Sequence, residues 1–594
     1  MSVTRVFDLL DRYENNFADK TDVFGVKRNG KWINYSAKDY IDISHKISYG
    51  LLSLGINKGD KIATISSNRP EWNFVDMAIL MAGAVHVPLF TSLSSEDYQY
   101  ILEHCEAKLV FVSDLCLYNL VREAIGQEHA DKLVYSFDEI ENVKNLEEIV
   151  KAGEQGAVYY KEELEATKKS IVEADFATLI YTSGTTGESK GVMLSHKNLV
   201  QNFLAATQVF KLGPDDKYLS ILPLCHVGGR MGNYQTQYSG SSLYYAENMG
   251  TIAANMKELA PNGFDAVPRI LEKVFDNVIA KGKKLKGMKK FIFFWAVKLG
   301  LKYKQNSQSS WWYKKRLKLA DRLIFSKWRE ALGNNIRLVG CGGAALQPRL
   351  ERVFWASGIK VLNMYGLTET SPIITINRQE EPDLKLGSVG ALIDGVELKI
   401  ADDGEILCRG HNVMLGYYKN EELTKQVFDE EGWFHTGDVG YLDEGKFLVI
   451  TDRKKEIFKL SSGKFIAPQI IENKIKESLC VDQVMVVGEC EKFASAIISP
   501  NIAYIKEWCA QNNLKYTSKE EIIQKPEIYT LIQEDIKQCN KNLAKPERIL
   551  RFRLVSDEWS PNSGELSPTL KLRRRFITEK YQDLIDQIYA KQAI

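Results

Sequence analysis

Residues 177–195, "ATLIYTSGTTGESKGVMLS", place a run of glycines and hydroxyl side chains between two short apolar segments. The flanking pieces ATLIY (177–181) and GVMLS (191–195) each read as a β-strand, and Ser195 is suited to cap a helix that follows. The spacing does not match GxxxxGK[ST], and a strand rather than a helix follows the loop. The stretch therefore predicts a strand–loop–strand unit that differs from a Walker phosphate loop.

The loop inside this unit offers many hydrogen-bond donors. Its glycines leave backbone N–H groups open to close approach, its hydroxyl side chains add donors, and its lysine adds a point charge. A solvated surface turn is the simpler alternative, but the ordered run of hydroxyls ending in a lysine favours a clamp for polyphosphate. The residues concerned are Ser183, Gly184, Thr185, Thr186, Gly187 and Lys190.

The bulk composition is that of a globular protein with more than one domain: 594 residues, 44% hydrophobic and 26% charged. Its nine cysteines are scattered without a CxxC pair or metal-ligand spacing, which favours free thiols in a reducing compartment. The first residues read as an acidic amphipathic helix and not as a signal peptide, and the longest apolar runs are too short to span a bilayer. We therefore expect a cytoplasmic protein, with peripheral membrane association left open.

Strand-like segments such as YLSILPL (218–224) alternate with helix-like ones, which predicts α/β architecture with largely parallel sheets. From about residue 387 the pattern changes to short strands separated by Gly and Asp turns, typical of a small β-rich subdomain. A charged segment at 451–457 marks a boundary, and Pro468 stands near the first turn of the next helix. We predict an N-terminal domain over 1–452 with the β-rich subdomain at 387–452, a hinge at 453–457, and an α+β domain over 458–594.

Four segments occur in an order that resembles a known family of enzymes. They are YTSGTTGESKGVMLSH (181–196), YGLTETSP (365–372), the stretch from GWFHTGD to PQIIE (432–472), and LSPTLKLRR (566–574). Together they are similar to the phosphate, adenine, ribose and catalytic-lysine signatures of the adenylate-forming (AMP-binding) superfamily, and the resemblance covers nearly the whole chain. It implies an N-terminal domain of two doubly wound sheets and a small mobile C-terminal domain. It also implies ATP and Mg²⁺, with coenzyme A as co-substrate, for converting a carboxylic acid to acyl-AMP and then to a thioester.

The resemblance assigns roles around the triphosphate and the reacting carboxylate. Lys190 and the 183–187 loop would hold the β- and γ-phosphates, and Thr368 would touch the α-phosphate. Glu369 would bind Mg²⁺, an ion that keeps most of its waters and needs few protein ligands. Lys571 would bridge the attacking carboxylate and the α-phosphate, where negative charge builds up. Without the family, a helix N-cap is the alternative reading of Thr368 and Glu369.

For the nucleoside, the resemblance implies that Tyr365 stacks on adenine, Asn363 bonds its exocyclic amine, and the 342–346 backbone lies against it. Asp438 would accept both ribose hydroxyls, supported by Arg453. Taken alone, Tyr365 would read as a core residue and Asp438 as a turn residue. The nucleotide-binding residues predicted in this way are Thr182, Ser183, Gly184, Thr185, Thr186, Gly187, Lys190, Gly343, Ala344, Asn363, Tyr365, Gly366, Thr368, Asp438, Arg453 and Lys571.

The resemblance also places a hinge at Lys455, about which the C-terminal domain rotates after pyrophosphate leaves. Gly463 would then let the thiol arm of coenzyme A pass through a tunnel. His226 would lie near the substrate carboxylate, with a satisfied buried histidine as the alternative. The block YYAENMGTIAANMKELAPNGFDAVPRILEKVF (244–275), and Leu570 where many members have glycine, are similar to long-chain fatty acyl-CoA synthetases.

The segment 281–330 carries 16 lysine and arginine residues against two acidic residues, together with four tryptophans. Such a segment suits an interface with anionic lipid, from which a poorly soluble fatty acid could be taken up. The alternative is a pair of ordinary helices that pack aromatic residues inward and leave lysines in water. Nucleic acid is a less favoured partner, because no recognition module accompanies the basic residues.

The sequence thus favours a fatty acid–CoA ligase for long chains. One alternative is a ligase that stops at acyl-AMP and loads a carrier protein, although such ligases typically carry an insertion near the hinge that is absent here. The other is a non-catalytic, nucleotide-binding membrane adaptor, against which the retained Lys190, Glu369, Asp438, Arg453 and Lys571 argue. Chain-length preference, oligomeric state and pathway do not follow from these patterns.

Overall fold

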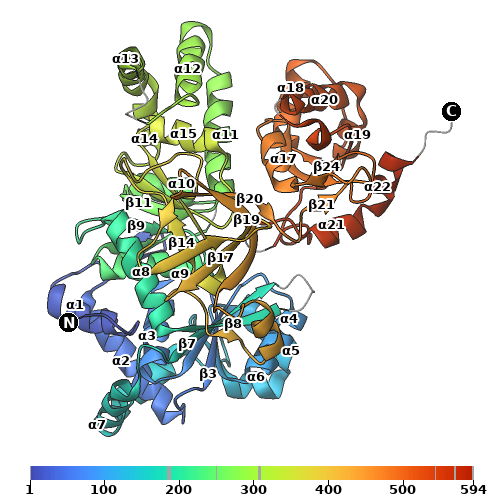
Figure 1. Cartoon of the computed structure of the whole chain (residues 1–594). Helices are drawn as coiled ribbons and strands as arrows, with labels where there is room; N and C mark the ends of the chain where they lie inside the picture. Colours follow the sequence, from blue (N-terminus) through green and yellow to red (C-terminus); the bar gives the residue numbers. More distant parts are fainter. Residues whose placement is uncertain are drawn as a thin grey trace.

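The computed structural model describes residues 2–183, 189–248, 250–305, 310–541, 543–567 and 570–590. Figure 1 shows a large N-terminal part built on two sheets and a smaller C-terminal part set against one side of it. The chain starts with α1 (Asp8–Asn16), the acidic helix expected from the sequence. The described residues form five hydrophobic clusters, and two of these are built chiefly from residues beyond 457.

The first sheet has seven strands in the order β18 (Gly416–Tyr417), β8 (Ser189–Ser195), β7 (Phe176–Ser183), β4 (Val85–Leu89), β3 (Lys61–Ile65), β5 (Ala107–Val112) and β6 (Val134–Ser136). One face packs on α4 (Ser95–Cys105), α5 (Leu115–Ile125) and α6 (Gln127–Leu133), and the other on α2 (Ala37–Ser53), α3 (Pro70–Met81) and α7 (Leu146–Ser170). The strands from β4 to β6 pair in parallel, as the alternating pattern predicts.

The quoted stretch forms the antiparallel pair β7–β8, with Thr182 opposite Lys190. Ser195 caps α8 (His196–Phe210), its side chain accepting a hydrogen bond from the backbone N–H of Asn198 at 3.1 Å. The predicted strand–loop–strand and cap are therefore confirmed. Residues 184–188, which include Gly184, Thr185, Thr186 and Gly187, lie outside the described residues.

The second sheet has nine strands in the order β15 (Ala391–Leu392), β14 (Ile373–Ile376), β13 (Lys360–Gly366), β12 (Leu338–Cys341), β11 (Gly263–Ala266), β9 (Lys217–Ser220), β10 (Ser242–Tyr245), β1 (Phe24–Arg28) and β2 (Lys31–Tyr35). Helices α8 and α9 (Val227–Tyr238) share one core with both sheets and lie between them. The outer face is covered by α10 (Ile252–Leu259), α11 (Pro268–Lys283), α12 (Gly287–Gly300), α13 (Trp311–Ala320), α14 (Ser326–Ala331) and α15 (Pro348–Ala356). The expected fold class, two doubly wound sheets, is confirmed.

The strand expected over 218–224 is shorter than predicted and ends at Ser220. Asn68 explains the end, because its amide donates to the carbonyl of Leu222 at 2.7 Å and accepts from the N–H of Leu224 at 3.0 Å. These side-chain bonds satisfy backbone groups that a strand neighbour would otherwise satisfy. The chain then turns into α9, which begins just after His226.

A four-stranded antiparallel sheet forms the β-rich subdomain: β16 (Val396–Ile400), β17 (Glu405–Gly410), β19 (Phe434–Asp443) and β20 (Phe447–Arg453), with α16 (Glu421–Gln426) nearby. Beyond it, β21 (Phe458–Lys459) pairs with β22 (Phe465–Ile466), and β23 (Val481–Val487), β24 (Ser495–Pro500) and β25 (Arg551–Leu554) form a three-stranded sheet. The surrounding helices are α17 (Pro468–Ile475), α18 (Ile502–Gln511), α19 (Lys519–Gln524), α20 (Pro526–Asn540), α21 (Arg574–Lys580) and α22 (Gln582–Tyr589). The α+β composition agrees with the expectation, and the exact domain boundaries stay a prediction.

Candidate active site

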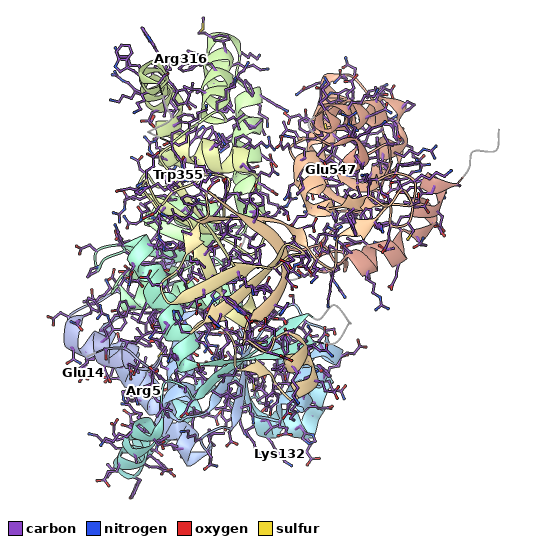
Figure 2. All side chains as sticks on the ribbon, in the orientation of Figure 1. Arg5, Glu14, Lys132, Arg316, Trp355 and Glu547 are labelled. Carbon is purple, nitrogen blue, oxygen red and sulfur yellow. The ribbon has the colours of Figure 1, made fainter. Side chains whose placement is uncertain are left out.

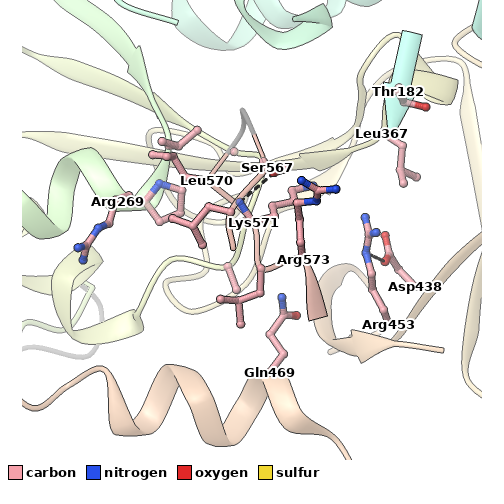
Figure 3. Close-up of a pocket in the computed structure, with 18 of the residues that line it drawn as sticks. Thr182, Arg269, Leu367, Asp438, Arg453, Gln469, Ser567, Leu570, Lys571 and Arg573 are labelled. Carbon is pink, nitrogen blue, oxygen red and sulfur yellow. Dashed lines mark hydrogen bonds and ion pairs between the residues drawn. The ribbon is translucent and has the colours of Figure 1, made fainter. Parts of the chain in front are cut away.

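A cleft of about 2910 Å³ opens where the two large sheets, the β-rich subdomain and the C-terminal part meet. Its walls come from the carboxyl ends of parallel strands β9, β11 and β12, an edge where α/β proteins commonly bind ligands. Figure 3 shows Lys571 and Ser567 of the C-terminal part reaching into this cleft opposite Asp438 and Arg453. The residues predicted for nucleotide or acid binding whose side chains the structure describes all line it.

Lys190 and Thr182 stand at the cleft end of the β7–β8 pair. The Lys190 ammonium lies 5.0 Å from the centre of the Tyr417 ring, a cation–π distance that fixes its direction. Burial lowers the pKa of Lys190, and Lys455 lowers it further while Glu369 opposes the change. The ammonium is thus subject to the opposing charges of a carboxylate and a second lysine.

Thr368 and Glu369 lie in a short 3₁₀ turn that follows β13. The turn is tight because a Cβ at Gly366 would lie 1.6 Å from the carbonyl oxygen of Pro372. Glu369 accepts a hydrogen bond from the Tyr417 hydroxyl at 2.9 Å, which orients its carboxylate toward the cleft. Gly366 is therefore needed to let the turn close and present Glu369.

Within the described residues no three His, Cys, Asp or Glu side chains come together as a metal cluster. A single carboxylate, Glu369, still fits Mg²⁺ if the other ligands are waters and phosphate oxygens of a bound nucleotide. The donor set at this place therefore suits an ion that arrives with its substrate rather than one caged by protein.

Tyr365, Asp438 and Arg453 form a connected group on the opposite wall. The Tyr365 hydroxyl donates to Asp438 Oδ2 at 2.8 Å, and Arg453 Nε lies 3.2 Å from Oδ1, because Asp438 and Arg453 are register partners on β19 and β20. Burial raises the pKa of Asp438, against the lowering effects of Arg453 and the Tyr365 hydrogen bond. The carboxylate keeps lone pairs for further donors.

The cleft wall beside Tyr365 is made of small residues. Gly343 has φ +82°, a left-handed conformation suited to glycine, and both Gly343 and Ala344 line the cleft. Asn363 is buried on β13, with its amide 3.5 Å from the carbonyl of Ser388. Small residues let a ligand approach this wall closely, which the predicted adenine site would need.

Lys571 comes from the C-terminal part and extends into the cleft. Its backbone N–H donates to the Ser567 hydroxyl at 3.1 Å, and Leu570 before it adopts φ +61°, the conformation that glycine would take more easily. Protein surrounds the side chain, although solvent in the cleft still reaches it. Desolvation and then Arg453 lower the pKa of Lys571 to about 8, while Asp438 and Glu369 oppose the change.

His226 has a hydrogen-bond partner within α9 and is half-buried in the cleft wall, and its place near a substrate carboxylate stays a prediction. It caps α9, its Nδ1 accepting from the N–H of Gly228 at 3.1 Å, and it also lines the cleft. Desolvation, followed by the nearby charge of Lys571, lowers the pKa of His226 to about 4. A neutral imidazole therefore stands close to Lys571 at physiological pH.

Lys455 lines the cleft between the β-rich subdomain and the C-terminal part. Gly463 does not: it lies in the turn between β21 and β22 with φ +82°, outside the described lining. In this arrangement the cleft contains Lys571 together with the predicted nucleotide residues, and Gly463 lies outside its lining.

Sequence reasoning missed an ion-pair group that begins three residues after Lys571. Arg574 donates to both oxygens of Glu472 on α17 at 2.7 Å each, and to Glu456 at 2.8 Å. The two carboxylates raise the pKa of Arg574, despite its burial. The pair links the segment after Lys571 to the predicted hinge, and partners more than a hundred positions apart leave no local signal.

Comparison with known proteins gives the family. The AMP-binding enzyme family matches residues 10–418, and the AMP-binding enzyme C-terminal domain matches residues 455–593. The chain therefore belongs to the AMP-binding enzyme family, which confirms the resemblance read from the motifs.

Among its relatives is a long-chain-fatty-acid–CoA ligase, FadD15, of Mycobacterium bovis, 32% identical over 95% of this chain and 94% of that protein. The human long-chain-fatty-acid–CoA ligase ACSBG1 is 29% identical over 100% of this chain and 86% of its own. The adenylation domain of a carboxylate reductase from Mycobacterium chelonae has the same fold, with a TM-score of 0.77, 21% identity, and 99% and 91% of the two chains covered.

Proposed function

We propose that the protein is an AMP-forming fatty acid–CoA ligase that acts on long-chain acids. The observation that carries the proposal is the meeting of Lys571, from the C-terminal part, with Lys190, Glu369 and Asp438 in one cleft. Relatives named long-chain-fatty-acid–CoA ligases, at up to 32% identity over most of the chain, support the substrate class.

In the first step, a carboxylate oxygen of the acid bonds to the α-phosphorus of ATP, and the bond from that phosphorus to the β-bridging oxygen breaks. Pyrophosphate leaves with the bonding electrons. We infer that the attacking carboxylate and the α-phosphate meet at Lys571, whose charge would offset the repulsion between two anions. Lys190 would face the departing phosphates, and Glu369 would hold the Mg²⁺ that neutralises part of their charge.

In the second step, the thiol sulfur of coenzyme A bonds to the acyl carbonyl carbon, AMP leaves with the electron pair, and the thiol proton passes to solvent. We infer that the C-terminal part first rotates at Lys455, which brings the Gly463 turn toward the acyl-AMP. The ion pairs of Arg574 with Glu456 and Glu472 must be rearranged or carried along in that rotation. Such closures commonly separate half-reactions.

The decisive experiment measures pyrophosphate release and thioester formation across acids of increasing chain length, with and without coenzyme A. A coenzyme A ligase converts long-chain acids to thioesters and releases one pyrophosphate for each thioester formed. Sustained release requires coenzyme A, because the thiol consumes the acyl-AMP. Stable acyl-AMP that is transferred to a carrier protein and not to coenzyme A would favour the alternative ligase. No release with any acid would favour the adaptor.

The basic segment 281–330 suggests a second partner for the same enzyme. Phe293 and Trp328 are buried, as ordinary helix packing requires. Trp311 and Trp312 at the start of α13 are instead 57% and 70% exposed, and Phe291 on α12 is 69% exposed. Aromatic residues are therefore presented outward among lysines, a composition that suits a headgroup region.

Figure 1 places α12 and α13 at one end of the molecule, and Figure 2 labels Arg316 there. The Lys315 ammonium lies 3.7 Å from the centre of the Trp311 ring. No described helix is both long and apolar enough to cross a membrane. We infer that this end lies on anionic lipid, because its charge complements such a surface and its tryptophans can enter the headgroup layer.

Sedimentation with vesicles tests this surface. Replacing Lys314, Lys315 and Arg316 with glutamine is expected to weaken binding to anionic phosphatidylglycerol vesicles by about fivefold per charge, because each cation contributes about 1 kcal/mol near the surface. Trp312→Ala is expected to weaken it further. Tyr159→Ala, at an exposed but less basic position on α7, is the matched control. Equal binding to neutral phosphatidylcholine vesicles, or no change in these variants, would contradict the inference.

A further inference from the structure

A carboxyl group lies in the cleft wall beyond the residues that meet the nucleotide. Asp265, on β11, lines the cleft together with Gly340 and Met364. The Tyr218 hydroxyl donates to Asp265 Oδ1 at 2.9 Å, and Tyr218 itself is buried. The mechanism proposed above uses neither side chain.

Two glycines make room for this carboxyl group. A Cβ at Gly232 on α9 would lie 2.1 Å from Asp265 Oδ2, and a Cβ at Gly340 on β12 would lie 2.2 Å from Oδ1. Real Cβ atoms do not approach so closely, so any other residue at either place would displace the carboxyl group. The helix and the strand on both sides are thus shaped to admit Asp265.

The surroundings do not neutralise the carboxylate. Among ion pairs between described residues, none includes Asp265, and its apolar neighbours include the rings or side chains of Phe210 and Met364, both close to Gly340. Burial raises the pKa of Asp265 to about 7, although the Tyr218 hydrogen bond lowers it. A carboxyl group held this way is costly for stability, and an apolar side chain would avoid the cost. A ligand that donates a hydrogen bond to this carboxyl group would offset the cost.

The rise of α9 gives the distance between Asp265 and the end of the cleft where His226 and Lys571 lie. His226 caps that helix beside Lys571, and Gly232 lies six positions later, which corresponds to about 9 Å along a helix axis. Gly228, one turn before Gly232, also lines the cleft. An acid whose carboxylate lies at His226 and Lys571 would therefore reach Asp265 several carbon atoms along its chain.

We propose that Asp265 forms a polar subsite in the acyl channel and that its carboxyl group accepts a hydrogen bond from a hydroxyl group partway along the chain of the acid. The preferred substrates would then be hydroxylated long-chain acids rather than simple saturated ones. The inference rests on the proposed function for its view of the cleft as an acid site. Asp265 acts in it as a specificity-determining residue and not as a catalytic residue.

The test measures binding by calorimetry, which needs no turnover, for hexadecanoic acid and for hexadecanoic acids hydroxylated at carbons 6 to 10. The wild-type protein is expected to bind one mid-chain hydroxy acid about 10- to 100-fold more tightly than hexadecanoic acid, the range for a hydrogen bond to a charged group. Asp265→Leu is expected to remove or reverse this ratio. Asp265→Asn keeps an acceptor oxygen in nearly the same shape, so part of the preference should remain.

Tyr218→Phe is the matched control, because it removes the partner of Asp265 and leaves the carboxyl group in place. A preference that persists in Tyr218→Phe and disappears in Asp265→Leu supports the subsite. Equal ratios in wild type and Asp265→Leu, or equally improved binding of both acids in that variant, would overturn it. Pyrophosphate release by the wild type with either acid judges the proposed function separately.

Discussion

Lys571→Ala is expected to lower the rate of acyl-AMP formation by about 100- to 1000-fold, the usual loss when one preorganised donor is removed from a developing charge. The side chain lies among Arg453, Asp438 and Glu369, in the cleft that also holds His226. Release of pyrophosphate from ATP and hexadecanoic acid, with coenzyme A present, measures the loss.

The second half-reaction provides the internal control. Chemically prepared acyl-AMP and coenzyme A should be converted to thioester by Lys571→Ala at close to the wild-type rate, because the proposed rotation withdraws Lys571 before the thiol reacts. Lys519→Ala is the matched variant, since Lys519 is a lysine of the C-terminal part with an exposed ion pair to Glu558 at 3.0 Å. Equal losses in both half-reactions would contradict the proposal that Lys571 acts in adenylation and is withdrawn before the thioester forms.

The same residue predicts a pH dependence. The pKa of Lys571 is lowered to about 8, so the ammonium is present below that pH and is lost as the pH rises through it. The kcat/KM for adenylation, which reports groups of the free enzyme, should therefore fall above about pH 8. Lys571→Arg, whose side chain stays protonated, should move this limb to higher pH even if its rate is lower. If kcat/KM for adenylation declines at the same pH in Lys571→Arg as in the wild type, the decline is caused by another group.

The sequence allowed the fold class to be predicted because its signals are local. The β7–β8 unit, the Ser195 cap and the start of α17 at Pro468 each depend on neighbouring residues. Much of the cleft was also predictable, because Glu369 and Asp438 lie within short motifs of the family. The structure adds the pairing of Asp438 with Arg453, which follows from strand register.

The remaining features depend on contacts between distant parts of the chain. Arg574 contacts Glu456 and Glu472 only in the folded protein, because these residues are far apart in the sequence. Asp265 reads as an ordinary strand residue until Gly232 of another element is placed beside it. Because the cost or benefit of a charge depends on burial and on its partners, no pattern in one segment can reveal it.

Arg230 is the clearest example of a charge whose cost depends on partners from distant parts of the chain. Its replacement has the largest expected effect on stability. Its side chain is fully buried on α9, where Nε donates to the Tyr234 hydroxyl and Nη1 to the Thr178 hydroxyl, at 2.6 Å each. Its Nη2 pairs with Asp76, which is also fully buried. Burial raises the pKa of Asp76, but Arg230, followed by His86, holds it below the ordinary value. The network joins α3, α9 and the seven-stranded sheet.

Arg230→Met is expected to destabilise the protein by about 3–5 kcal/mol, because it leaves the buried carboxylate of Asp76 without its guanidinium. The midpoint of urea unfolding, followed by fluorescence, measures the change. The double variant Arg230→Met/Asp76→Leu should recover much of the loss, since replacing both members of a buried pair is far less costly than removing one. Equal destabilisation in the single and double variants would show that packing of the arginine, and not its charge, is what matters.

The pH dependence of Arg230→Met separates these two causes further. In the wild type the pKa of Asp76 is lowered, so its contribution to stability is present above the unfolded-state pKa and is lost as the pH falls through the folded-state value. Without Arg230 the carboxyl pKa should rise above the unfolded-state value, because burial then dominates, and protonation relieves the unpaired charge. The difference in stability between wild type and variant should therefore narrow as the pH falls from 7 toward 5. Arg230 lies one turn after His226, and its backbone N–H donates to the His226 carbonyl at 3.0 Å. Loss of the Arg230 network should therefore also disturb the part of the cleft where His226 lies.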